Sequence, residues 1–155
     1  MAVIDLSLPI RKAYFTALNG LTYQGVPIPI YDEIWNGESA IINYLGQNAE
    51  CYIVMQSQTE SNHPVPTYCS QRMNCRISVR IVTKYMSEGN KMLSELIAND
   101  VLNSIIINRY GKHNLTSPEI SIQSVIFEDS NNTIEFAGNE SAFSRILTFN
   151  NIVND

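Results

Sequence analysis

The chain has 155 residues, a formal net charge of −5 and 45% apolar residues. The length predicts one domain over residues 1–155, and the apolar fraction argues against wholesale disorder. A free-standing nucleic-acid-binding protein usually carries a basic excess, which this acidic chain lacks. No apolar run of about 18 residues occurs and the first residues lack a secretory pattern, so we expect neither a membrane span nor export. The three cysteines show no C-x-x-C spacing, which favours a reducing compartment.

Residues 7–20 are predicted to form the first helix. Ser7 is suited to cap its start, and Gly20 follows its last turn. The apolar residues fall at the helical spacing of one buried stripe, namely Ile10, Ala13, Tyr14, Ala17, Leu18 and Leu21. We therefore expect this helix to lie against an apolar layer.

Residues 25–34, GVPIPIYDEI, alternate like a strand although they contain Pro27 and Pro29. In one extended strand the two missing N–H groups would point to the same side, leaving only the other side able to pair. This pattern predicts a protected sheet edge, or a surface held for something other than its own sheet. Gln24 and Gly25 supply the turn that precedes it.

The next strands are predicted at residues 51–58 and 70–83, with a polar loop at 59–68. The second of these strands has the cleanest alternation in the chain, with an apolar row of Met73, Cys75, Ile77, Val79 and Ile81. Arg72, Arg76 and Arg80 share its opposite face. Two interpretations remain open: a solvated face, or guanidinium groups that pair with carboxylates of a neighbouring subunit.

A second helix is predicted from about Ser87 to Ile107, with Leu93, Leu96, Ile97, Val101 and Ile105 on its apolar face. Strands at 119–128 and 142–153 follow, separated by a turn-rich segment at 129–141 that includes a short strand at 133–136. Short connections favour antiparallel pairing. The predicted fold is α+β, a mostly antiparallel sheet with two helices packed on one face as a two-layer sandwich.

Candidate chemistry is sparse in this sequence. His63 and His113 lie in predicted loops without further ligands at metal-binding spacing, and no phosphate-binding glycine pattern occurs. Cys69 and Cys75 have no base beside them. Adjacent carboxylates at Asp32-Glu33 and Glu128-Asp129 should point to opposite strand faces, so they form no local catalytic pair. We predict no enzyme activity, no catalytic residues, no cofactor and no metal.

The order of elements resembles the tail terminator (tail-completion) proteins of bacteriophages. The segments that carry the resemblance are VPIPIYDEI (26–34), CYIVMQSQTE (51–60), CRISVRIV (75–82), the helix from Ser87 and FSRILTFNNIV (143–153). Residues 59–68 and 129–141 look longer than in the plainest members, and Pro27 is additional. The resemblance implies a homo-oligomeric ring, usually a hexamer, that caps the tail tube and joins the tail to the head.

The implied location is the virion, in the tail or neck, after assembly in the host cytoplasm. The implied partners are further copies of the chain, the tail tube protein and a head-completion or connector protein. DNA would pass through the lumen without specific binding, because negative walls repel phosphates. Candidate lumen carboxylates are Asp32, Glu33, Glu60, Glu128 and Asp129.

The predicted subunit interface comprises Tyr31, Asp32, Glu33, Arg72, Arg76 and Arg80. Arg76 and Arg80 are the two expected to pair with Asp32 and Glu33 of the next subunit. A closed ring needs two different contact surfaces on each copy, and a basic row and an acidic strand end are complementary. Two alternatives stay open: a neck ring between portal and tail, with a dodecamer as a further copy number, and a small soluble ligand-binding or enzymatic α+β domain.

Overall fold

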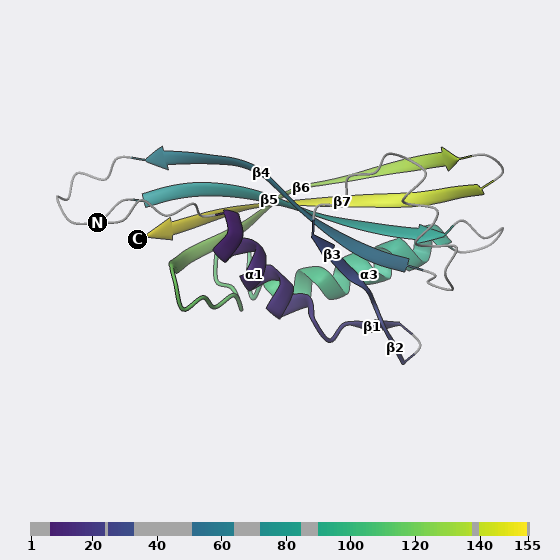
Figure 1. The fold of residues 1–155 in the computed structure, drawn as a ribbon, viewed down its shortest axis with the longest axis horizontal. Coiled ribbons are helices and arrows are strands. Elements are labelled where there is room, and N and C mark those ends of the chain that lie inside the picture. Colours follow the sequence, from purple (N-terminus) through teal and green to yellow (C-terminus); the bar gives the residue numbers. More distant parts are fainter. Residues whose placement is uncertain are drawn as a thin grey trace.

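The computed structural model describes residues 7–23, 25–32, 51–63, 72–84, 90–137 and 140–154. Its main feature is a long five-stranded sheet with two helices beneath one face, and a small two-stranded hairpin projects beside them (Figure 1). The α+β fold with a mostly antiparallel sheet is therefore confirmed. Within the described residues, no helix has both the length and the apolar character needed to cross a membrane.

The helices are α1 (Ser7–Leu18) and α3 (Asn90–Ile105). The strands, in chain order, are β1 (Thr22–Tyr23), β2 (Val26–Pro27), β3 (Ile30–Asp32), β4 (Cys51–His63), β5 (Arg72–Lys84), β6 (Ser121–Ala137) and β7 (Glu140–Asn154). β1 pairs with β2, and the large sheet has the order β3-β4-β5-β7-β6. Its neighbouring strands are antiparallel except β3 and β4, which run parallel.

The proline-containing segment is at a sheet edge, as predicted, but it is not one continuous strand. Pro27 ends β2 opposite Thr22, and β3 begins after Pro29, whose carbonyl accepts a 2.9 Å hydrogen bond from the Ile53 N–H. β3 then forms one end of the large sheet. It can run parallel to β4 because the intervening chain is long enough for a crossover.

Two strands are longer than predicted. The predicted loop at 59–68 is wrong at its start, because β4 continues to His63 and pairs there with Arg72. The predicted turn-rich segment at 129–141 is wrong at its start, because β6 continues without a turn to Ala137, and the strand predicted at 133–136 is the last part of β6. Each pairing contains register shifts, between Ser57 and Thr59 in β4 and at two places in β6, and the polar residues at both strand ends still pair with a neighbouring strand.

The core lies between the sheet and the helices. The apolar row of β5 faces it as predicted, since Cys75, Ile77, Val79 and Ile81 are buried and Met73 packs against them. The stripe on α1 is confirmed in the same way, with Ile10, Ala13, Tyr14 and Leu18 buried. One member of the predicted α3 face is wrong: Leu96 is 59% exposed, while Ser94 and Ala98 are buried beside Ile97, Val101 and Ile105. α3 also ends before Ile107, because Ile106 forms a bridge with His113.

A buried polar link fastens α1 to the sheet. The Tyr14 hydroxyl donates a 2.6 Å hydrogen bond to Asn151 Oδ1, and Asn151 Nδ2 donates to the Cys75 carbonyl at 3.0 Å. One asparagine on β7 therefore connects the helix with β5. Burial raises the pKa of Tyr14 well above its usual value, although the hydrogen bond to Asn151 opposes that shift.

Candidate subunit-contact surfaces

His113, Cys51 and Cys75 are held or buried within the fold. The Leu115 N–H donates to His113 Nδ1 at 3.0 Å, so Nε2 carries the proton and donates to the Ile122 carbonyl at 2.8 Å. His63 is the last residue of β4 and not a loop residue. Cys51 and Cys75 are buried thiols. Among the described residues, no group of three or more His, Cys, Asp or Glu side chains could hold a metal ion; Cys69 lies outside them.

Two arginines of the predicted interface contact their own sheet. Arg76 Nε lies 3.1 Å from Glu128 Oε2, in a pair whose side chains are 54% and 29% exposed. Arg80 Nε donates to Ser144 Oγ at 2.9 Å, and burial lowers the pKa of Arg80. Contacts between Arg76 or Arg80 and a neighbouring subunit stay a prediction, and they would have to share or replace these contacts.

The other predicted interface residues are described only in part. Tyr31 lies on β3 and packs edge-on against Tyr52 of β4, with ring centroids 5.8 Å apart. Asp32 ends β3 and Arg72 begins β5, so the backbone of both is placed. Glu33 lies outside the described residues, and Glu60 is placed only as a backbone position of β4. No contact between the arginine row and the acidic end of β3 follows from these placements.

The expectation that Glu128 and Asp129 point to opposite faces is wrong. A register shift lies between Phe127 and Asp129, so Glu128 is an extra residue in β6. Glu128 reaches Arg76, and Asp129 lies opposite Thr148. Arg76 and Thr148 both lie on the sheet face away from the core, so the two carboxylates do as well. Adjacent carboxylates share a face here because the bulge interrupts the alternation.

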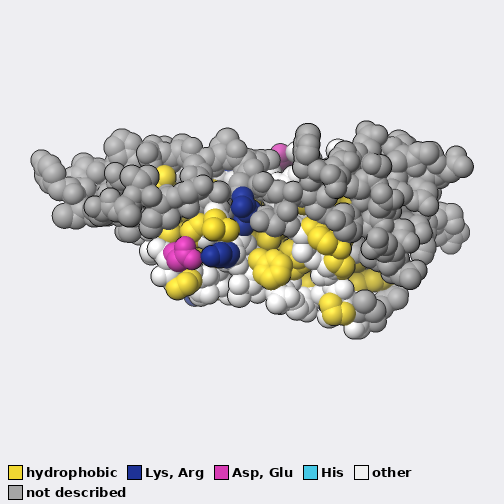
Figure 2. Space-filling view, viewed as in Figure 1, with side chains coloured by type: hydrophobic (Ala, Val, Ile, Leu, Met, Phe, Trp, Pro, Cys, Tyr) yellow, Lys and Arg dark blue, Asp and Glu magenta, His cyan; other side chains and the backbone are white. Residues whose placement is uncertain are grey.

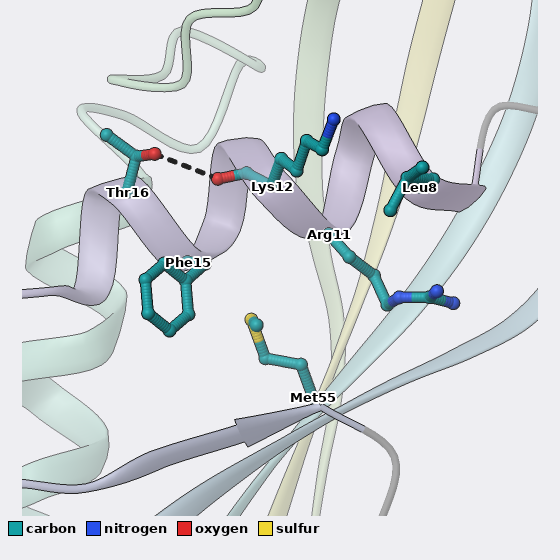
Figure 3. Close-up of a pocket in the computed structure, with 6 residues that line it drawn as sticks. All are labelled: Leu8, Arg11, Lys12, Phe15, Thr16 and Met55. Atoms are coloured by element: carbon teal, nitrogen blue, oxygen red, sulfur yellow. Dashed lines mark hydrogen bonds between the residues drawn. The ribbon is translucent and has the colours of Figure 1, made fainter.

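The outer face of α1 carries apolar side chains that the sequence analysis missed. Leu8 and Phe15 are 48% and 43% exposed, and they lie two turns apart on one side of the helix. With Arg11, Lys12, Thr16 and Met55 they line a pocket of ≈ 290 Å³ (Figure 3). Met55 projects from β4 and forms its floor. The sequence does contain an indication of this surface, because Leu8 and Phe15 are large apolar residues seven positions apart that do not belong to the buried stripe.

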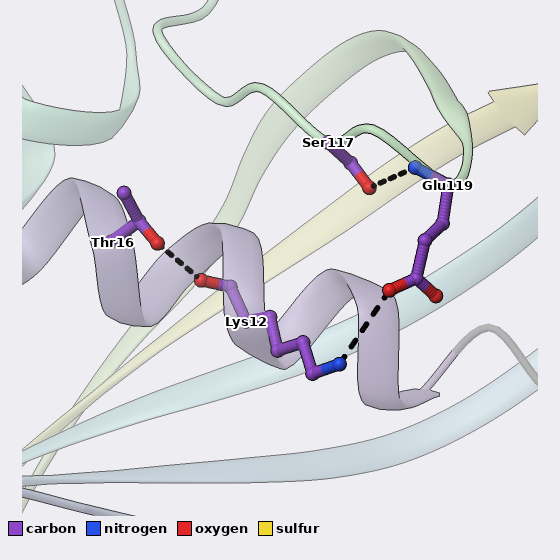
Figure 4. Close-up of polar contacts among 4 residues, drawn as sticks. All are labelled: Lys12, Thr16, Ser117 and Glu119. Atoms are coloured by element: carbon purple, nitrogen blue, oxygen red, sulfur yellow. Dashed lines mark hydrogen bonds and ion pairs between the residues drawn. The ribbon is translucent and has the colours of Figure 1, made fainter.

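The charged rim of this pocket is basic. α1 contains Arg11 and Lys12 and no acidic residue. Lys12 Nζ lies 3.5 Å from Glu119 Oε1, but the side chains are 60% and 46% exposed (Figure 4). Exposed pairs of this kind contribute about 0–1 kcal/mol, so Lys12 can exchange one carboxylate for another. In Figure 2, apolar and charged side chains lie together over the region where Figure 1 places α1.

The second exposed surface is formed by α3 and β6. Two pockets of ≈ 330 and ≈ 280 Å³ adjoin there and share Leu102 and Phe127. Phe127 is 37% exposed and packs on the buried Phe149, with ring centroids 5.6 Å apart. On the outer side of α3, the exposed Leu96 is close in sequence to Glu95 and Asp100, both of which are also exposed.

No family model matches this chain, and no curated protein matches it in sequence. Among solved structures, it is similar to a chain of a structure described as "Virion of native gene transfer agent (GTA) particle". The match has a TM-score of 0.62 and 11% sequence identity, and it covers 99% of this chain and 100% of that chain. The two chains share a fold from end to end.

Proposed function

We propose that this chain is a structural protein of a phage-like virion and forms the ring that caps the tail tube and joins the tail to the head. The observation that carries the proposal is the end-to-end similarity in fold to a chain of a gene transfer agent virion. A fold alone hosts many functions, so the proposal also rests on the element order that resembles tail terminators.

The surroundings of the chemically reactive side chains support a role without catalysis. A nucleophilic cysteine needs exposure and a nearby base, whereas Cys51 and Cys75 are buried. Both ring nitrogens of His113 are used in holding the segment after α3. The exposed apolar side chains of α1 and α3 are instead the kind of surface that protein partners cover.

The test is assembly of the purified chain, alone and with the tail tube protein of the same virion. Light scattering after size exclusion should give a multiple of 17.5 kDa, and electron microscopy should show closed rings at one end of each tube. Adding the chain during tube growth should fix the tube length. A chain that stays monomeric and leaves tube growth unlimited would contradict the proposal. Rings that bind the portal and not the tube would indicate the neck position.

The proposed lumen can be tested with the same rings. A ring of acidic chains should not retain double-stranded DNA, because its walls repel phosphates. We expect no shift of linear DNA in an electrophoretic assay at about physiological ionic strength, where the Debye length is about 8 Å. Tight, salt-sensitive retention of DNA would contradict this part of the proposal.

A further inference from the structure

The outer face of α1 borders a pocket and carries Arg11 and Lys12, whereas the outer face of α3 exposes Leu96 between Glu95 and Asp100. We propose that the outer face of α1 in one copy binds the outer face of α3 in the next copy, with Leu96 entering the pocket above Met55. This inference rests on the proposed function, because it identifies the partner of these surfaces as a second copy in the ring.

The apolar part of the proposed contact consists of Leu96 of one copy and the pocket beside α1 of the next. Leu96 is 59% exposed on α3, and the pocket beside α1 is bounded by the half-exposed Leu8 and Phe15. Its volume of ≈ 290 Å³ exceeds the roughly 150 Å³ of cavities that hold a benzene molecule, so a leucine side chain fits. Covering these side chains removes apolar surface from water at about 25 cal/mol per Å².

The charges around the pocket and the leucine are opposite. Arg11 and Lys12 both line the pocket, with Arg11 on the side of Met55 and Lys12 turned towards Glu119 (Figures 3 and 4). On α3, Glu95 precedes Leu96 and Asp100 lies one helical turn beyond it. When Leu96 occupies the pocket, an i, i+4 neighbour such as Asp100 comes close to the basic rim. Two of these charges already take part in exposed ion pairs, Lys12–Glu119 at 3.5 Å and Glu95–Arg145 at 4.0 Å, which the new contact would have to share or replace.

The same charges explain why the contact joins unlike surfaces. Two α1 faces would bring cations together, and two α3 faces would bring carboxylates together, so symmetric pairs are disfavoured. α1 packs against α3, β3 and β4, and α3 also packs against β5 and β7. Leu8, Phe15 and Leu96 stay exposed beside these contacts, so both surfaces of one copy are available to neighbours. A contact of this heterologous kind generates a ring when its rotation closes.

Charge reversal on each side tests the contact. We expect Asp100→Lys and Lys12→Glu each to raise the concentration needed for ring assembly about tenfold or more, in sedimentation velocity at low salt. The thermal midpoint of each variant should stay close to that of the unmodified chain, because both side chains are exposed. The matched control is Lys112→Glu, an exposed cation beyond α3, which should assemble normally.

Mixing the two single variants supplies the decisive measurement. Where the two variants alternate in a ring, one contact joins Lys12 to Asp100 and the next joins the new glutamate at position 12 to the new lysine at position 100. Equimolar mixtures should therefore recover assembly that neither variant shows alone. Leu96→Asn should also weaken assembly, whereas Ile107→Asn, at a similarly exposed residue, should not. Normal assembly of either charge reversal, or failure of the mixture to recover, overturns this contact. An unmodified chain that forms no ring contradicts the proposed function itself, so the two failures are distinguishable.

Discussion

Tyr14 and Asn151 are 137 positions apart, yet their side chains meet in the core. Replacing Tyr14 by phenylalanine keeps the ring and removes the donor, which leaves Asn151 Oδ1 buried without its 2.6 Å partner. We expect Tyr14→Phe to lower the free energy of unfolding by about 1–3 kcal/mol in urea titrations. Tyr110→Phe is the control, because Tyr110 is 79% exposed, and its effect should stay within about 0.5 kcal/mol.

The same tyrosine predicts how stability changes in alkali. Burial raises the pKa of Tyr14 in the folded chain, so the unfolded chain loses this proton first, near pH 10. Above that pH the folded state binds more protons than the unfolded state, and stability falls as the pH rises. The decline between about pH 9 and 11 should be shallower in Tyr14→Phe than in the unmodified chain. If stability falls with pH equally steeply in both proteins, ionisation of Tyr14 is not the cause of the decline.

Ile77 is fully buried in the middle of β5 and lies opposite Phe149. Truncation to alanine leaves a cavity that the neighbouring strands cannot fill completely. We expect Ile77→Ala to cost about 2–5 kcal/mol in chemical unfolding, against about 0.5 kcal/mol or less for Ile126→Ala, since Ile126 is 40% exposed. If the two variants lose the same stability, the sheet face has been assigned wrongly.

At the scale of elements, two glycines follow the ends of the helices with positive φ. Gly20 follows α1 with φ 118°, and a Cβ there would meet open space, whereas at Gly111, with φ 98°, a Cβ would lie 2.7 Å from Ser124 Cβ. Gly20→Ala should therefore cost about 1–2 kcal/mol of backbone strain. Gly111→Ala adds overpacking against β6, about 1–3 kcal/mol more, which thermal unfolding can resolve. Equal losses would mean that the turn moves away from β6 at no cost.

The sequence predicted those elements whose hydrophobic periodicity is undisturbed. α1 and β5 each have an unbroken apolar row, so the buried face followed directly from spacing. The ends of β4 and β6 could not be predicted, because Ser, Asn, Asp and Glu favour turns locally while pairing with a long neighbouring strand keeps them extended. Leu96 was assigned to the buried face because a wide apolar stripe leaves several helix rotations equally plausible.

Less of the contact surfaces than of the fold could be predicted from the sequence. Arg76 and Arg80 lie on the face of β5 that was predicted for them, but the contact of Arg76 with Glu128 depends on a bulge in β6 and on the strand order β5-β7-β6. The pocket beside α1 needs Met55, 40 positions beyond Phe15, to supply its floor. Long-range pairings of this kind leave no periodic signal in one sequence.

At the scale of the whole molecule, the absence of catalysis is a prediction with a direct test. His63→Ala and Cys69→Ser should leave ring assembly and the infectivity of reconstituted virions close to those of the unmodified protein. Lost infectivity with normal rings in either variant would reopen the enzymatic alternative. His113→Ala belongs to another class, because it removes the acceptor of the Leu115 N–H and should lower stability by about 1–3 kcal/mol.

The link between α1 and β7 also bears on the order of events during translation. Helix α1 leaves the ribosome early, but the asparagine that holds its tyrosine is Asn151, on the last strand in the chain order. The hairpin of β6 and β7 is local in sequence and forms fast, whereas the hydrogen bond between Tyr14 and Asn151 must close a loop of well over a hundred residues. In a nascent chain α1 can pack against β3 and β4 as soon as these strands are made, but its tyrosine finds its buried partner only when β7 has been made.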